Sequence, residues 1–364
     1  MMSIAAAGPA DYGQMASLIS DSATVKQNLD LLTTQISTGL VSNTYAGLGS
    51  GTAVSLNLNP QIAALQTWQN NINQAASSMQ VTQTAMTQIQ QIASNFLAET
   101  GNLEGADASE VDSVAAAAQQ ALVQVAGLLD TQDGNTYVFA GQDTTNPPVP
   151  DPDSILSSQF YTQIAAQVGQ LGTQGATATT TNTLAIAGSN APGLTPFSAY
   201  LSQPAGVAQA PAIEIGQGQT ASVGLLASAN SAVTSTGVPA TSTGSYMRDL
   251  MLSLATIGSL SSSQVSDSGY TTLVQSTNTT LTGAISAMAE DVGVLGNTQT
   301  NLTTDQTTMA DTATALTTQV GDVQDVDVAQ AMSNLSLVQT QLQGSYQVIA
   351  AMSGLSLAKY LPVS

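Results

Sequence analysis

A heptad repeat near the C-terminus constrains the fold of this chain more than any other feature of its sequence. Four apolar residues are spaced by seven, at Val328, Leu335, Leu342 and Ile349. The companion positions three residues later are Ala331, Val338, Ser345 and Met352. This spacing predicts one long helix over Asp325–Leu361, with a narrow apolar seam that needs partner helices. Because several seam residues are small, we expect the helix to be ordered mainly by docking.

A matching repeat near the N-terminus supplies a partner. A helix is predicted over Tyr12–Thr38, and its seam alternates between spacings of four and three at Leu18, Ser22, Val25, Leu29, Leu32 and Ile36. At about 1.5 Å per residue this helix spans roughly 40 Å, close to the roughly 45 Å of Val328–Leu357. Gly39 follows it, where helices commonly end on glycine. Because the lengths and the seams match, we predict that the two helices pair.

Further helices are predicted between the two ends of the chain. Their ranges are Pro60–Leu97, Ser109–Leu129 and Tyr246–Leu260. The longest repeat follows them, at Leu281, Met288, Leu295, Leu302, Met309, Leu316 and Val323. Only five residues separate Val323 from Val328, which breaks the heptad phase. We therefore predict a joint at Asp325–Asp327, with Asp325 or Asp327 capping the terminal helix.

The middle of the chain differs in character from both ends. Residues 146–245 are rich in Thr, Ala, Gly and Pro, and they begin with the stiff, non-helical stretch Pro147–Pro152. We predict an inserted, mainly β domain here, with a disordered low-complexity linker as the alternative. The predicted fold class is mainly α, an elongated, nested rod of long antiparallel coiled-coil helices from both chain ends. Three domains are predicted: residues 1–39 plus 325–364, residues 40–145 plus 246–324 with a small β-hairpin, and residues 146–245.

Composition argues against several classes of function. Only Lys26, Arg248 and Lys359 oppose 23 acidic residues, which disfavours binding to nucleic acid or to anionic membranes. Cys and His are both absent, which removes disulfides, thiol catalysis and Cys-based metal sites. A serine nucleophile would need Lys26 or Lys359 as its base, and both lie on terminal helices. No run of about 20 apolar residues is present, so membrane insertion is not expected. We predict a protein that is not an enzyme and has no cofactor or metal.

Short motifs stand in both terminal thirds of the chain. Near the N-terminus is Gln35-Ile36-Ser37-Thr38-Gly39. Near the C-terminus are Leu295-Gly296 with Gln299 and Leu302, Asp325-Val326-Asp327-Val328-Ala329, Ser345-Tyr346, and Tyr360-Leu361. In this order they resemble the terminal motifs of the bacterial flagellins and flagellar hook-associated proteins. The motif residues that carry the resemblance are Gln35, Ser37, Gly39, Leu295, Gly296, Asp325, Asp327, Ala329, Tyr360 and Leu361.

One further block favours a particular branch of that family. Gly134–Gly141, followed by Asp143-Thr144 and Pro147-Pro148, resembles the hook-associated protein 3 branch, which forms the junction between hook and filament. On this resemblance we predict a junction adapter. A filament flagellin subunit is the first alternative, and a secreted adhesin or other surface coiled-coil protein is the second. The segment Leu40–Gly47 departs from the family, which usually has a basic pair and an Asp-Asp-Pro element there.

The resemblance implies a structural protein of the extracellular flagellum, exported unfolded through the type III channel with an export chaperone. It implies assembly with neighbouring copies and with other axial proteins, namely hook-associated protein 1 and flagellin. The thin seams agree, because they bury too little apolar surface alone to offset the entropy of ordering. The predicted assembly interface is Leu18, Val25, Leu29, Leu32, Ile36, Val328, Leu335, Val338, Leu342 and Ile349. The alternative is that these residues only close a helical bundle within one chain.

Overall fold

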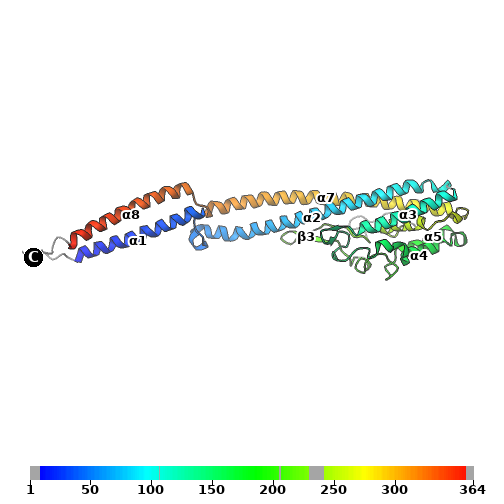
Figure 1. Ribbon diagram of the computed structural model, residues 1–364, viewed down its shortest axis with the longest axis horizontal. Coiled ribbons are helices and arrows are strands. Elements are labelled where there is room, and N and C mark those ends of the chain that lie inside the picture. Colours follow the sequence, from blue (N-terminus) through cyan, green and yellow to red (C-terminus); the bar gives the residue numbers. More distant parts are fainter. Residues whose placement is uncertain (1–8, 106, 205, 229–241, 358–364) are drawn as a thin grey trace, which may run out of the picture. The chain divides into compact units, whose positions relative to one another are not determined.

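The computed structural model describes residues 9–105, 107–204, 206–228 and 242–357 and is mainly helical, as predicted (Figure 1). The α-helices are α1 (Pro9–Thr38), α2 (Thr52–Thr100), α3 (Ala108–Leu129), α4 (Gln159–Val168), α5 (Leu171–Ala187), α6 (Tyr246–Gly258), α7 (Tyr270–Gln324) and α8 (Val328–Leu357). Four short 3-10 helices are η1 (Tyr45–Gly51), η2 (Leu103–Gly105), η3 (Pro152–Ser157) and η4 (Ser262–Gln264). The described strands form two antiparallel hairpins, β1 (Gln132–Asp133) with β2 (Thr136–Tyr137) and β3 (Ala212–Gly216) with β4 (Gln219–Ser222).

The chain divides into two compact units. Unit 1 consists of Met1–Leu65 and Asp311–Ser364, and unit 2 consists of Gln66–Ala310. Unit 1 therefore holds α1 and α8 together with the start of α2 and the end of α7. The short 3-10 helix η1 also lies in unit 1, and the remaining described elements belong to unit 2.

In unit 1, α1 and α8 pack against each other as an antiparallel pair, which confirms the predicted pairing (Figure 1). The helix α1 ends at Thr38, and Gly39 follows with a φ of +72°, a conformation that glycine adopts without strain. At the start of α8, the backbone N–H of Gln330 donates to Asp327 Oδ1 at 3.0 Å. Asp327, one of the two predicted caps, therefore satisfies an N-terminal donor of α8.

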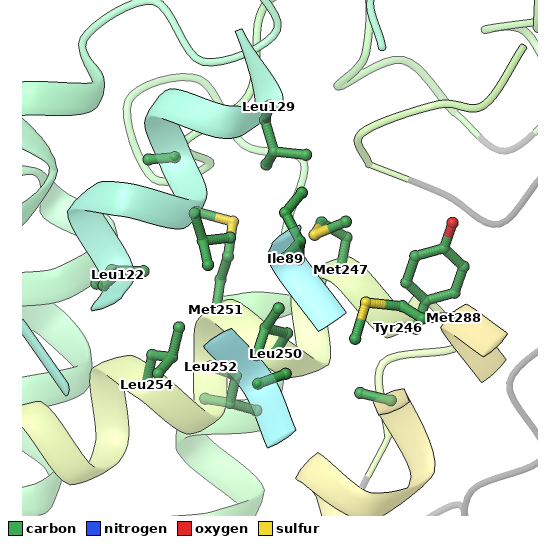
Figure 2. Close-up of a cluster of buried hydrophobic side chains, with 14 of the residues drawn as sticks. Ile89, Leu122, Leu129, Tyr246, Met247, Leu250, Met251, Leu252, Leu254 and Met288 are labelled. Atoms are coloured by element: carbon green, nitrogen blue, oxygen red, sulfur yellow. The ribbon is translucent and has the colours of Figure 1, made fainter. Parts of the chain in front are cut away.

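Unit 2 is built around α6. All thirteen residues of this helix are buried, which is typical of a helix surrounded by other elements. It packs against α3, α4 and α5, and its side chains meet those of Ile89 and Met288 (Figure 2). Leu122 and Leu129 of α3 lie in the same cluster. One apolar face of α2 is also buried in this unit, at Ile72, Ala75, Met79, Met86, Ile89, Ala93 and Phe96.

A buried arginine of α6 forms hydrogen bonds to two loops of unit 2. The Arg248 guanidinium donates to the carbonyl oxygens of Ser228, Ala187 and Ser189 and to Asn190 Oδ1, at 2.6–3.2 Å. Burial lowers the pKa of Arg248 to about 10, which leaves it charged at neutral pH. Neighbouring Asp249 accepts hydrogen bonds from Ser242 and Thr243, while its burial raises its pKa.

The predicted mainly β character of residues 146–245 is wrong. This stretch holds α4 and α5, and its one described hairpin is β3–β4. In α4, Phe160, Ile164 and Val168 follow the four-residue spacing of a helix face and are buried. In α5, buried Thr179 and Thr183 donate their hydroxyls to carbonyls of their own helix, at 3.0 and 3.1 Å. These internal bonds let a threonine-rich stretch be buried as a helix.

The predicted start of α2 is also wrong. The helix begins at Thr52, so Pro60 lies in its interior and not in its first turn. Pro60 is exposed, and water can bind the carbonyl of Leu56 that a proline leaves without a donor. The predicted ranges of α3 and α6 agree with the structure to within two residues at each end.

Candidate assembly interface

The predicted seam residues lie along the α1–α8 pair, but they are only partly covered. In α1 the half-buried positions are Leu18, Val25, Leu29, Leu32 and Ile36. In α8 the half-buried positions are Leu335, Val338, Leu342 and Ile349. Val328, at the start of α8, is exposed. The structure therefore brings nine of the ten predicted interface residues into one seam and leaves that seam partly open to water.

Small residues are the most buried members of the seam. Ser22 is 6% exposed and Ala331 is 3% exposed. Full burial of a leucine or valine side chain contributes about 1.5–3 kcal/mol, and half-buried side chains contribute correspondingly less. The seam closes tightly only where its residues have little apolar surface, so the pair gains modest stability within one chain.

Unit 1 also exposes apolar side chains outside the seam. Of the large hydrophobic residues that the structure describes as exposed, nine lie in unit 1: Ile19, Leu31, Tyr45, Leu56, Val328, Met332, Leu337, Tyr346 and Val348. Leu337 of α8 is the most exposed of them, at 59%. The two in unit 2 are Val207 and Val294. Among the described residues, unit 1 therefore exposes more large apolar side chains than unit 2 does.

A groove runs beside the end of α1. Its volume is about 410 Å³, and it is lined by Gln27, Asp30, Leu31, Thr34, Gln35, Thr38 and residues 40–44. Exposed Leu31 forms part of its wall. The groove therefore extends the exposed apolar surface of α1 onto the segment that connects α1 to α2.

At the joint, the two connecting segments of unit 1 are paired. The Val41 N–H donates to the Gln324 carbonyl at 2.7 Å, and the Val326 N–H donates to the Gly39 carbonyl at 2.9 Å. These bonds form an antiparallel bridge between Leu40 and Asp325. We call this pairing of residues 39–41 with residues 324–326 the strap. It ties the end of α1 to the start of α8.

Four of the predicted motif residues meet at the strap. Gln35 Nε2 donates to the Val41 carbonyl at 2.8 Å, and Gly39 and Asp325 take part in the backbone pairing. Asp327 caps α8 directly after it. Motifs from opposite ends of the chain therefore meet at the strap. The sequence predicted a joint at Asp325–Asp327 but not its pairing with residues 39–41.

The remaining motif residues lie elsewhere. Ser37 donates to the Thr34 carbonyl within α1, and Ala329 is exposed in the first turn of α8. Leu295 and Gly296 belong to unit 2, where Leu295 is buried and Gly296 lies near Gln83. Tyr360 and Leu361 lie outside the described residues.

Sequence reasoning missed the exposed apolar residues outside the seam. The signal was present, because Met332 and Leu337 occupy heptad positions other than the two that form the seam. Leu337 lies at a position that faces away from the partner helix of a simple pair, and Met332 lies at a position that flanks the seam. An apolar residue there indicates a second contact surface.

The described residues include no group of three or more Asp or Glu side chains placed to hold a metal ion. No described helix combines the length and the apolar character needed to cross a membrane. Asp130, at the end of α3, accepts a hydrogen bond from the Val149 N–H at 2.9 Å, and burial raises its pKa to about 6. Its single backbone partner gives it a structural role in holding residue 149.

Comparison with known protein families gives two matches. Residues 14–144 match the bacterial flagellin N-terminal helical region. Residues 279–361 match the bacterial flagellin C-terminal helical region. The first match covers most of α1 together with α2 and α3, and the second covers most of α7 together with α8. No curated protein matches the chain.

Proposed function

The chain belongs to the bacterial flagellin family and is a structural component of the flagellum, and on this premise we propose that it is the hook–filament junction adapter. It leaves the cell unfolded through the flagellar export channel, with an export chaperone. Its terminal helices then assemble with neighbouring copies, with hook-associated protein 1 and with flagellin. It performs no catalysis.

The observation that carries the assembly role is the unequal exposure of apolar side chains. Unit 1 leaves nine large hydrophobic residues exposed, whereas the core residues of unit 2 are closed off from water. A chain that worked alone would gain stability by covering Leu31, Met332 and Leu337. Their exposure is accounted for if neighbouring subunits cover them.

The junction role is proposed because the block at residues 134–148 resembles the hook-associated protein 3 branch in sequence, and the structure describes the form of this block. Its turn is set by Gly134, with a φ of +61°, between β1 and β2. Gly141, with a φ of +69°, fits closely against its neighbours, and a Cβ there would lie 2.6 Å from the Gln209 carbonyl. The block that resembles the junction branch is therefore a defined structural element whose glycines the backbone requires.

A deletion strain tests the proposed role directly. Loss of the gene should leave hooks without filaments and release flagellin into the medium, and expression of the wild-type chain should restore filaments. An intact filament in the deletion strain would contradict the junction role, provided that no second copy of the gene is present.

The alternative role, a filament subunit, makes a different prediction for the purified protein. A filament flagellin should polymerise into long tubes when polymerisation is induced, whereas a junction adapter should not. Electron microscopy of the pure chain under such conditions separates the two roles. Long tubes would favour the filament subunit.

A seam variant tests assembly through the terminal helices. Leu342→Asp places a charge in the half-buried seam of α8 and should abolish incorporation into flagella. Unit 2 should stay folded, because Leu342 belongs to unit 1. Near-ultraviolet circular dichroism of the secreted variant reports on unit 2, and immunoblotting of sheared flagella reports on incorporation. Normal incorporation would show that the seam is not needed for assembly.

A further inference from the structure

Unit 2 carries a groove between α2 and its two hairpins. The groove has a volume of about 610 Å³, within the roughly 300–1,000 Å³ of sites that bind small molecules. One wall is a face of α2, and the other wall comes from the β1–β2 and β3–β4 hairpins. Its lining side chains include Asn71, Gln74, Ser77, Asp133, Tyr137 and Ile213.

A second hollow, of about 310 Å³, lies further along α2 and reaches Gln88. The two hollows share one face of the helix, because their lining residues on α2 recur at spacings of three and four. At about 1.5 Å per residue, this face is roughly 20 Å long between Gln74 and Gln88. We call the two hollows together the α2 groove. Its length fits a linear ligand. The α2 residues with this spacing are Gln74, Ser78, Val81, Ala85 and Gln88.

The lining of the α2 groove is polar but almost uncharged. The described lining residues include no Lys or Arg, and Asp133 is the one acidic residue among them. An anionic ligand would find no cation there and would meet the carboxylate of Asp133. The amides of Gln74 and Gln88 and the hydroxyl of Ser77 can each donate and accept hydrogen bonds. This lining suits a neutral ligand that carries many hydroxyl groups.

The backbone beside the groove is already paired, which disfavours an extended peptide as the ligand. A peptide that adds to a sheet edge is held by unpaired backbone groups of that edge. Here the Tyr137 N–H donates to the Thr144 carbonyl at 2.9 Å. The Glu214 carbonyl accepts from Asn71 Nδ2 at 3.1 Å, a bond that also fixes the Asn71 side chain in the wall. Recognition in the groove therefore depends on side chains.

Apolar surface lies between these polar groups. Ala75, Val138 and Val223 line the groove and are at most 6% exposed, so they form its floor. The half-buried ring of Tyr137 adds an aromatic surface with a polar tip. A sugar ring has the complementary form, because its C–H groups make apolar faces and its hydroxyls surround the edge.

We propose that the α2 groove binds a linear, neutral oligosaccharide. Its hydroxyls bond to the amides and hydroxyls of α2, and its ring faces lie against Tyr137 and the apolar floor. Asp133 accepts hydrogen bonds from sugar hydroxyls and excludes acidic sugars. The groove belongs wholly to unit 2, so this binding is independent of whether the protein acts at the junction or in the filament.

Ligand-observed NMR and calorimetry of the purified full-length chain test the proposal. The neutral probes are maltohexaose, mannohexaose and the N-acetylglucosamine hexamer, and the acidic probe is hexagalacturonate. At least one neutral probe should bind at millimolar concentration or below, and hexagalacturonate should bind about tenfold more weakly or not at all. Absence of binding by all three neutral probes would overturn the proposal. So would tighter binding of hexagalacturonate, or of a neutral Ser-Gly-Gln peptide, than of any neutral sugar.

A set of three variants places the binding in the groove. Gln74→Ala and Tyr137→Leu should each weaken the neutral sugar by about fivefold or more, because each removes a contacting group. Gln120→Ala makes the first substitution at an exposed residue of α3 away from the groove, and should leave the affinity unchanged. Near-ultraviolet circular dichroism checks that all three fold like the wild type. Sugar binding that both Gln74→Ala and Tyr137→Leu retain in full would refute the assignment of the site.

Discussion

The two units use the same kind of sequence repeat and obtain different structures from it. Within α7, the repeat residues Leu281, Met288, Leu295 and Leu302 belong to unit 2 and are at most 6% exposed. Leu316 and Val323 continue the same repeat in unit 1, where they are only half-buried. The difference lies in the neighbours: unit 2 adds α3–α6 to its long helices, whereas among the described residues unit 1 adds only the short 3-10 helix η1 to its own. A heptad repeat therefore specifies which face of a helix is covered. The number of elements packed against that face decides how completely it is buried.

This comparison has a functional meaning. Unit 2 has a closed core and the polar fastening by Arg248, so it can be stable in a single chain. Unit 1 has a thin seam, exposed leucines and one backbone strap, and under the proposed function contacts with neighbouring subunits supply much of its stability. The following predictions test this difference in stability between the two units, from the largest expected effect to the smallest.

The first prediction compares two leucine truncations. Leu122→Ala, in the core of unit 2, should lower the free energy of unfolding by about 4 kcal/mol, because the side chain is fully buried and its removal leaves a cavity. Leu342→Ala, in the half-buried seam, should lower it by less than about 1 kcal/mol. Urea denaturation of both purified variants measures the difference. Equal losses would mean that the two units do not differ in the way proposed.

The second prediction concerns the buried arginine. Arg248→Met keeps an unbranched apolar side chain but leaves the carbonyls of Ser228, Ala187 and Ser189 without the guanidinium donors, and should cost about 3 kcal/mol. The loss should appear in thermal unfolding of unit 2. Lys26→Met removes an exposed lysine from α1 and serves as the control, with an expected change within about 0.5 kcal/mol. A tolerated Arg248→Met would show that the hydrogen bonds of Arg248 do not hold unit 2 together.

The third prediction is a pH dependence of unit 2. Burial raises the pKa of Asp130 from 3.8 to about 6, so the folded state binds its proton more tightly than the unfolded state does. The stability contributed by this proton is fully present below pH 3.8 and is lost as the pH rises through about 6. Asp130→Asn keeps an oxygen acceptor for the Val149 N–H and should stabilise unit 2 near pH 7. Because Asp130 is only half-buried, the gain should be about 1 kcal/mol or less.

Melting curves of wild type and Asp130→Asn at pH 4.5 and pH 7.5 measure this effect. The difference between the two proteins should be larger at the higher pH. Because Asp249 also has a raised pKa, the comparison uses the difference between variant and wild type and not the wild-type curve alone. A difference that is independent of pH would mean that Asp130 does not titrate in this range.

The smallest expected effect lies in unit 1. Gly344→Ala should raise the helix content of the isolated chain slightly, because alanine is favoured over glycine in a helix by about 1 kcal/mol and the Cβ meets no atom. Far-ultraviolet circular dichroism measures the change. The same substitution should leave the melting temperature of unit 2 unchanged. A shift in that temperature would mean that the stability of α8 is coupled to unit 2.

The heptad rows were predictable because each follows a period that the helix geometry fixes. They located α1, α7 and α8, and the predicted range of α3 agrees with the structure to within two residues. The Thr-rich stretch of α5 was not predictable from composition, since its hydroxyls bond within the helix. The strap was also beyond sequence reasoning, because it depends on backbone groups of Gly39, Val41, Gln324 and Val326, and every residue carries such groups. The motifs marked its position but not its hydrogen bonds.

The central claim is that the exposed apolar residues of unit 1 are covered by other subunits. Incorporation into flagella of Leu337→Asp tests it most directly, because Leu337 is 59% exposed and lies outside the seam. Val207→Asp, at a residue of unit 2 that is 52% exposed, is the matched control. We predict that both variants are secreted and fold like the wild type, that Val207→Asp appears in sheared flagella at the wild-type level, and that Leu337→Asp is absent from them. Incorporation of Leu337→Asp at the wild-type level would contradict the claim.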